Sequence, residues 1–240
     1  MTDISPTMTV GDIVARDLRS AAVFTRHGID FCCGGRRSLD EACRARGVNP
    51  DELVRELDAA GADPGGAEDA SQWPLEQVVE RILQHHHAYI RQQVPVIQAF
   101  THKLATKKGP TYPELVILAE AFDQLADDLA HHLAKEENIL FPFIDAMLAA
   151  RQMSHRAPRT PFGTIQNPVR VMEAEHQHAG EDMRHIRTLT GDYQPPPEAC
   201  PTWRACYAAL EDFERDLHAH VHLENNILFP AAARLEEELS

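Results

Sequence analysis

The chain has 240 residues, 43% of them hydrophobic, and a formal net charge of −14. This length allows one domain of ordinary size with a small companion, and the apolar fraction is sufficient for a packed core. The balance of 23 Lys and Arg against 37 Asp and Glu disfavours nucleic acid and anionic lipid as partners. Small molecules, metal ions and other proteins are the expected partners.

Three features of the sequence indicate a cytoplasmic protein. No apolar run reaches the roughly 18 residues that a membrane helix needs, and the N-terminal stretch MTDISPTMTV lacks the basic and then apolar pattern of a secretory signal. The five cysteines are odd in number and include the adjacent pair Cys32 and Cys33, so they do not predict a disulfide framework. A reducing compartment and no membrane partner are expected.

The first 62 residues predict a small helical domain. Ser38 precedes a helical pattern with Glu41 three residues later, and Asn49 and Pro50 begin another with Glu52 in the corresponding place. The stretch GADPGGAEDA, residues 61 to 70, has no apolar periodicity and is interpreted as a linker. A second domain is expected over residues 72 to 240.

The second domain contains four long helical patterns separated by short loops. They cover residues 74–106, with Pro95 as an expected kink, 113 to beyond 142, 167–191, and 202 almost to the C-terminus. Four such helices with short connections predict an all-α fold, an antiparallel four-helix bundle preceded by the small helical domain.

Two related motifs recur in the second and fourth helical patterns. The stretch HLAKEENILFP occupies residues 132 to 142, and HVHLENNILFP occupies residues 220 to 230. Each places a histidine four residues before a glutamate, in step with the apolar residues of its helix. The two stripes are Leu118, Phe122, Leu125, Leu129, His132, Glu136 and Ile139, and Leu210, Phe213, Leu217, His220, Glu224 and Ile227. Both pairs are expected to face the bundle core.

The other two helices each add one histidine. In the third, His176 shares a face with Val169, Met172, Ala179, Met183 and Ile186. In the first, the stripe is Val79, Leu83, Ile90, Val94 and Ile97, and either His86 or His87 completes it. Periodicity does not choose between these two, but the spacing of the repeats favours His87, which precedes His132 by 45 residues as His176 precedes His220 by 44.

Six polar side chains in one core point to a metal centre. A single buried histidine is usually hydrogen-bonded to the backbone, but burying two carboxylates and four imidazoles without compensation would cost roughly several kcal/mol per ion. Imidazole and carboxylate ligands suit iron, manganese or zinc, and two carboxylates that face each other across a bundle can bridge two ions.

The arrangement of these motifs resembles one known family. A ferritin-like di-iron site would need two Glu-x-x-His motifs, and only Glu173 and His176 have that spacing. Single histidines on two helices and His-x-x-x-Glu on the other two resemble a hemerythrin-like domain over residues 72 to 240. VFTRHGIDFCCGG, MEAEHQHAGE, PPPEAC and LENNILFP together resemble the di-iron proteins for repair of iron centres.

This resemblance implies a non-haem di-iron centre, oxo-bridged with two bridging carboxylates. It implies repair of iron-sulfur clusters damaged by nitric oxide or peroxide, with iron-sulfur proteins as partners and nitric oxide or oxygen as small ligands. The oxygen carriers use five histidines where this chain offers four, which argues against simple oxygen carriage. The implied ligands, with His87 chosen over His86 because HAYIRQQVP matches the family's first-helix motif, are His87, His132, Glu136, His176, His220 and Glu224.

Other assignments are separate from the metal ligands. Cys32 and Cys33, followed by two glycines, could act in redox chemistry or metal transfer, or could be two small half-buried side chains, and the resemblance favours redox or transfer. Glu175, beside His176 but off the apolar stripe, is expected on a solvated face, with support of a metal-binding histidine or a proton relay as the alternative. The remaining cysteines, Cys43, Cys200 and Cys206, are expected to be structural. Iron donation is the favoured function; reduction of nitric oxide, or binding of nitric oxide or oxygen as a scavenger or sensor, is the alternative. The sequence leaves open whether the chain forms a homodimer.

Overall fold

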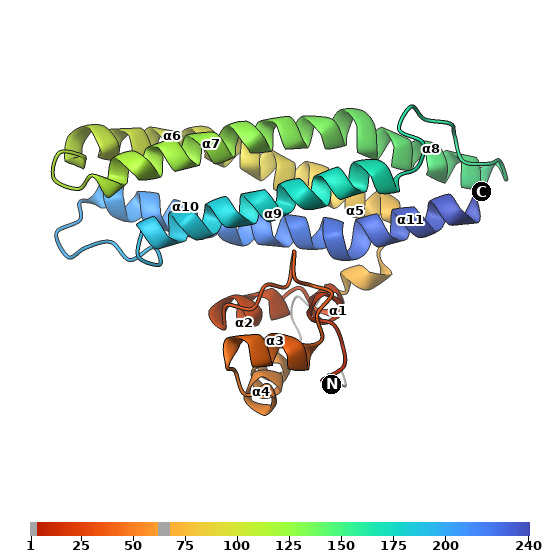
Figure 1. Cartoon of the computed structure of the whole chain (residues 1–240), viewed down its shortest axis with the longest axis horizontal. Coiled ribbons are helices and arrows are strands. Elements are labelled where there is room, and N and C mark those ends of the chain that lie inside the picture. Colours follow the sequence, from red (N-terminus) through yellow and green to blue (C-terminus); the bar gives the residue numbers. More distant parts are fainter. Residues whose placement is uncertain (1–3, 62–67) are drawn as a thin grey trace. The chain divides into compact units, whose positions relative to one another are not determined.

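The structure is a computed structural model that describes residues 4–61 and 68–240 (Figure 1). Within these ranges the chain is helical, and strand pairing is limited to one isolated bridge between Thr9 and Ser38. The α-helices are α1 (Val10–Arg16), α2 (Ser20–Arg26), α3 (Leu39–Arg46), α4 (Pro50–Gly61), α5 (Leu75–Arg81), α6 (Ala88–Lys108), α7 (Glu114–Lys135), α8 (Phe141–Gln152), α9 (Gln166–Leu189), α10 (Pro201–Leu223) and α11 (Phe229–Glu238).

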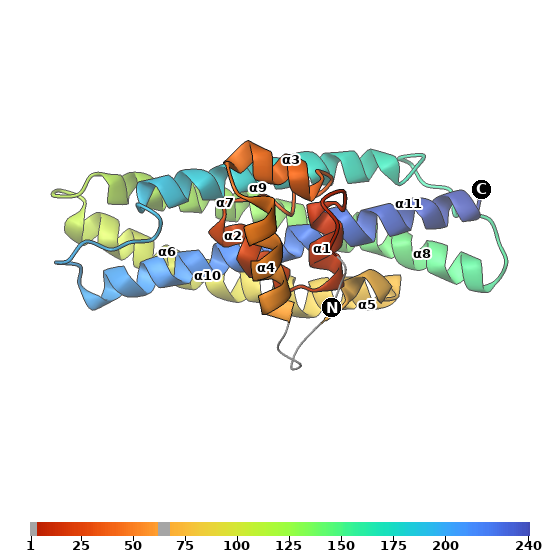
Figure 2. The same cartoon turned by 90° about the horizontal axis from the view of Figure 1, so that it is seen from below.

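Residues 81–146 and 158–218 form one compact unit. Its long helices are α6, α7, α9 and most of α10, which run side by side in both views as an antiparallel bundle (Figures 1 and 2). Helix α7 packs against both α6 and α9. In the core the rings of Phe122 and Phe213 meet edge to face, with centroids 5.5 Å apart. The predicted all-α four-helix bundle is confirmed.

The predicted apolar stripes are buried over most of their length. All six residues expected on one face of α9, from Val169 to Ile186, are buried. Ile139 was expected to continue the stripe of α7, but its side chain is 48% exposed while Leu140 is buried. Ile139 lies in a π-helical turn, Glu136–Leu140, which lowers the angular step per residue. In the corresponding turn of the second copy, Glu224–Leu228, the equivalent Ile227 is buried as expected.

Two more π-helical turns interrupt the long helices, at Ile82–His87 and Glu224–Leu228. Each of the three turns carries or adjoins one of the histidines or glutamates predicted as metal ligands. Helix α6 continues through Pro95, so the irregularity of the first long helix lies at the π-helical turn. Such turns occur often at functional sites, because they redirect neighbouring side chains without ending the helix.

Residues 1–80, 147–157 and 219–240 form the second compact unit, of which residues 1–3 and 62–67 are not described. Ser38 and Glu41 form the predicted capping box at the start of α3, and the side chain of Asn49 accepts a hydrogen bond from the backbone N–H of Asp51. Most of the predicted linker lies outside the described residues, so the boundaries at 62 and 72 stay predictions.

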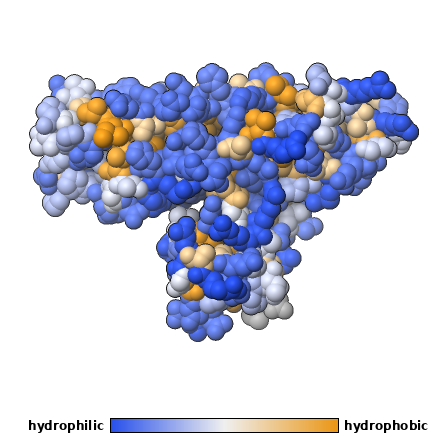
Figure 3. Space-filling model, viewed as in Figure 1, coloured by the Kyte–Doolittle hydropathy of each residue, from blue (hydrophilic) through white to orange (hydrophobic). Residues whose placement is uncertain are grey.

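The surface is mostly polar. Figure 3 shows hydrophilic residues over most of the visible face, with apolar residues in small separate patches. Among the described residues, no helix combines the length and apolar character that crossing a membrane requires.

Candidate metal centre

Four of the six predicted ligands meet within the bundle unit. Nε2 of His87 lies 3.2 Å from Oε2 of Glu136, and Nε2 of His132 lies 3.1 Å from Oε1 of the same carboxylate. Nε2 of His176 lies 3.0 Å from Nε2 of His132. All four side chains are buried, and Glu136 is completely inaccessible. The first turn of η3 (Glu136–Leu140) therefore places one carboxylate between two imidazoles.

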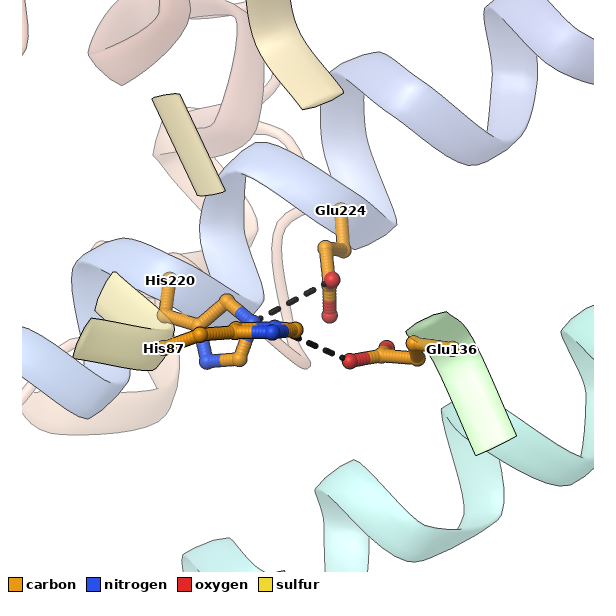
Figure 4. Close-up of side chains that lie close together, drawn as sticks. All are labelled: His87, Glu136, His220 and Glu224. Carbon is orange, nitrogen blue, oxygen red and sulfur yellow. Dashed lines mark ion pairs between the residues drawn. The ribbon is translucent and has the colours of Figure 1, made fainter. Parts of the chain in front are cut away.

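The remaining two predicted ligands lie one helical turn apart. His220 belongs to α10 and Glu224 begins η4 (Glu224–Leu228), so His220 Nε2 lies 3.2 Å from Oε1 of Glu224. Neither side chain is accessible to solvent. Figure 4 shows His87, Glu136, His220 and Glu224 pointing toward one another, and their ligand atoms all lie within 4.8 Å.

A second group of four shares both carboxylates with the first. His132, Glu136, His176 and Glu224 also have ligand atoms that all lie within 4.8 Å of one another. Each group therefore contains two imidazoles of its own and the same two glutamates. Two histidines per ion and two shared carboxylates are what a pair of bridged metal ions requires.

Of the adjacent histidines left open by periodicity, His87 belongs to these groups. Both His86 and His87 are buried, because η2 (Ile82–His87) turns them toward different neighbours. His87 faces Glu136, and its ring stacks on Phe141 with centroids 5.8 Å apart. His86 instead lies against Asp216, with Nδ1 3.0 Å from Oδ1.

Two further glutamates hold the outer nitrogens of the predicted ligands. Nδ1 of His87 donates to Oε1 of Glu137 over 2.7 Å, and Nδ1 of His132 donates to Oε2 of Glu175 over 2.9 Å. Glu137 also pairs with Arg91, and Glu175 with Lys135. Glu175 is half-buried rather than fully solvated, because α9 turns it toward α7. Its contact with His132 fits the alternative, a carboxylate that supports a metal-binding histidine.

The charge state of these outer carboxylates follows from their partners. Partial burial alone would raise the pKa of Glu137, but hydrogen bonds from His87 and Arg91 outweigh it and leave the pKa lowered. The pKa of Glu175 is likewise lowered, since Lys135 and His132 outweigh the effect of burial. An ionised carboxylate only accepts hydrogen bonds, so Nδ1 of each histidine carries the proton.

The tautomers make these residues fit a bound cation. With the proton on Nδ1, a neutral His87 or His132 presents the lone pair of Nε2 to a buried carboxylate oxygen. Neither oxygen of Glu136 receives a hydrogen bond from the described residues. Nitrogen and carboxylate lone pairs repel each other across 3.1 and 3.2 Å, and a cation between them reverses that repulsion. The donor set is nitrogen and oxygen, which suits iron.

The adjacent cysteines lie in a loop that one carboxylate organises. Oδ1 of Asp30 accepts hydrogen bonds from the backbone N–H groups of Cys32, Cys33 and Gly34 over 3.1, 2.9 and 3.0 Å. It also accepts from the Cys32 thiol over 3.3 Å. Cys32 is buried and Cys33 half-buried. The neighbouring Cys33 thiol, burial and the charge of Asp30 raise the pKa of Cys32 well above its usual value, so Cys32 is a thiol at neutral pH.

The same loop is fixed to the helical segment that carries Glu224. Nδ2 of Asn226 donates to the backbone carbonyls of Cys32 and Phe31 over 3.0 and 3.3 Å. The approach is so close that a Cβ atom on Gly35 would lie 2.2 Å from Oδ1 of Asn226. The Asn-Asn doublet was visible in the sequence, but its partners 190 or more residues earlier were not. Cys32 and Cys33 group with Asp30 and with neither set of predicted metal ligands.

Known proteins resemble the chain over nearly all of its length. Residues 78–232 match the hemerythrin HHE cation binding domain, and residues 6–61 match a domain of unknown function, DUF542. Proteins named iron-sulfur cluster repair protein YtfE, from Yersinia pestis strain Pestoides F and Yersinia pseudotuberculosis serotype O:1b strain IP 31758, are each 36% identical over 220 residues. These alignments cover 91% of this chain and 93% of each relative.

Proposed function

The chain belongs to the hemerythrin HHE cation binding family, and we propose that it repairs iron-sulfur clusters damaged by nitrosative or oxidative stress by donating iron from a di-iron centre. The observation that carries the proposal is the pair of four-residue groups that share Glu136 and Glu224. The names of the Yersinia relatives support the same function.

We assign the six ligands as two sets. His87 and His220 would hold one iron, His132 and His176 would hold the other, and both glutamates would bridge the pair. The residues that each group brings within 4.8 Å support this division. Two non-haem iron ions held there would supply ferrous ions as cargo and open positions for small ligands such as nitric oxide or oxygen.

The protein's own contribution is to orient the ligand atoms and to exclude water from them. Glu137 and Glu175 hold two imidazoles in the tautomer that exposes Nε2, while burial excludes competing water. The absence of thiolates from both four-residue groups favours release, because nitrogen and oxygen ligands hold ferrous iron less tightly than sulfur does. Protonation of an imidazole would remove a ligand, so the affinity for iron should decrease as the pH is lowered.

The partners would be iron-sulfur proteins that have lost cluster iron, in the cytoplasm. Cys32 and Cys33 would act in transfer or reduction beside the metal site. The contact of Asn226 with the Cys32 carbonyl supports such a role, because it ties the cysteine loop to a residue two positions after Glu224.

The deciding experiment compares iron-loaded protein with free ferrous iron. Anaerobic mixing with an apo iron-sulfur enzyme, sulfide and a thiol reductant should restore that enzyme's activity faster than ferrous iron at the same concentration. A protein that does no better than free iron, yet binds nitric oxide tightly, would overturn iron donation in favour of scavenging or reduction of nitric oxide.

A further inference from the structure

A cluster of two histidines and one aspartate lies outside both groups of predicted ligands. Its members are His85 and His86 of η2 and Asp216 of α10, all in the bundle unit. Nδ1 of His86 lies 3.0 Å from Oδ1 of Asp216, and Nε2 of His85 lies 3.8 Å from the same oxygen. The two imidazole rings meet edge to face with centroids 4.9 Å apart.

The π-helical turn explains how three consecutive histidines divide between two places. His87 points into the buried core, His86 is buried against α10, and His85 is 54% exposed. The cluster therefore begins at the surface with His85 and ends at the residue next to a predicted ligand. The side chain of Asp216 is 13% exposed, so it is mostly buried but lies near the surface.

The separations within the cluster match those of ligands on one cation. Bonds of about 2.1 Å at a tetrahedral ion place neighbouring ligand atoms about 3.4 Å apart. The observed 3.0 and 3.8 Å lie on either side of that value, and all three ligand atoms lie within 4.8 Å. Two imidazoles and one carboxylate are a common donor set for divalent iron, cobalt or zinc.

Asp216 also retains coordinating capacity. Its Oδ2 atom is buried and receives no hydrogen bond from the described part of the chain. A carboxylate that served only to orient His86 would leave this oxygen without a role, since the contact with His86 uses Oδ1. A divalent cation bound by Oδ1, or by both oxygens, would compensate the buried charge.

We propose that His85, His86 and Asp216 form a third site for a divalent cation, separate from the two groups that share Glu136 and Glu224. With three protein ligands and an exposed histidine, it binds more weakly and exchanges faster than the enclosed centre. Ferrous iron is the physiological occupant, and it binds this site transiently as it enters or leaves the centre. This transit role rests on the proposed function, but the cation site itself does not.

Cobalt binding to the iron-loaded protein tests the site. Calorimetry and the visible absorption of Co²⁺ should show one additional equivalent in the wild type, with the iron content unchanged after gel filtration. Asp216→Asn keeps the shape of the side chain and should weaken this equivalent about tenfold or more, and His85→Ala should weaken it similarly. Asp212→Asn is the matched control, because Asp212 is an exposed residue of the same helix that pairs with Arg215.

Iron release supplies a second measurement that does not depend on repair. Transfer from the loaded protein to a ferrous chelator should be several-fold slower in Asp216→Asn than in Asp212→Asn, at equal iron content. Absence of an additional cobalt equivalent in the wild type, or equal cobalt affinity in the two variants, would overturn the site. Loss of cobalt binding in Asp216→Asn without slower release would overturn only the transit role, whatever the result of the repair assay.

Discussion

Nδ1 of His87 lies 2.7 Å from Oε1 of Glu137, and this hydrogen bond determines which nitrogen of a fully buried imidazole faces Glu136. Arg91 pairs with the same carboxylate at 2.6 Å, so a cation at the edge of the bundle is connected to the ring through one side chain. Partners of this kind fix the orientation of a ligating histidine and raise its basicity.

Replacing Glu137 should therefore weaken iron binding without touching a ligand. We expect Glu137→Ala to lower the affinity of the iron next to His87 about 10- to 100-fold, and Glu137→Gln to have a smaller effect because its carbonyl still accepts the hydrogen bond. Competition with a ferrous chelator measures this affinity. Glu120→Gln, an exposed substitution on α7, the helix that leads into η3, is the control, and equal affinity in Glu137→Ala and this control would contradict the role of Glu137.

The shared carboxylates predict a different pattern of iron loss. Glu136→Leu or Glu224→Leu should weaken both proposed iron sites, because each glutamate belongs to both groups, whereas His87→Leu should chiefly weaken one. Leu fills the volume of the lost side chain, so the bundle is expected to remain folded. Metal analysis per chain, with circular dichroism as a check on folding, distinguishes the variants. The same iron loss in all three would exclude bridging by the glutamates.

The bundle and its six polar core residues could be predicted because they depend on local periodicity. A histidine and a glutamate four residues apart share a helix face whatever the neighbouring helices do. Glu137 was not assigned, and Glu175 was left with two possible roles, since each lies one residue from a core position and its partner is set by the packing of another helix. The π-helical turns were also invisible to a period of 3.6 residues, and Ile139, which lies in one of them, was expected to be buried and is exposed.

In the second compact unit, the contact between His222 and Phe31 is expected to be sensitive to acid. The ring of His222 packs on Phe31 with centroids 5.7 Å apart, and burial lowers its pKa to about 4, although the Phe31 carbonyl and Asp12 oppose the shift. As the pH falls, His222 therefore becomes protonated near pH 6.5 in the unfolded chain but only near pH 4 in the folded chain. Neutral His222 contributes its full stability above the unfolded-state pKa of 6.5, and this contribution is lost as the pH falls from 6.5 to about 4.

The variant His222→Gln should remove this acid sensitivity while keeping a side-chain N–H donor. Denaturant unfolding at several pH values should show that the wild type loses on the order of 3 kcal/mol more than the variant between pH 6.5 and 4. Metal ligands titrate in both proteins, so the difference between them isolates His222. Parallel curves for the two proteins would show that protonation of His222 does not limit acid stability.

The cysteine pair should contribute to repair without contributing to iron binding. We expect Cys32→Ser with Cys33→Ser to retain the iron of the wild type, because neither thiol belongs to the two groups of predicted ligands. Restoration of the apo iron-sulfur enzyme should be slower. Iron analysis and the repair assay on the same preparation separate the two effects, and loss of iron from this double variant would place the thiols in the metal site.

The two cysteines should also differ in reactivity. Cys33 is half-buried, whereas Cys32 is 6% exposed and its pKa is raised well above the usual value by Cys33, burial and Asp30, so alkylation at pH 8 should modify Cys33 first. Mass spectrometry of the modified peptides measures each rate. Equal rates would contradict the burial of Cys32.

Asn226→Ala should remove much of the protection of Cys32. Asn226 donates to the carbonyls of Phe31 and Cys32, and each hydrogen bond contributes about 1 kcal/mol, so local opening of the loop should become roughly 30-fold more frequent. The repeated motif provides the control: Asn138 stands at the position of Asn226 in the first copy, but it is exposed and donates to the Ala134 carbonyl of its own helix. Asn138→Ala should leave the alkylation rate of Cys32 unchanged. A Cys32 that reacts equally slowly in both variants would mean that Asp30 alone fixes the loop.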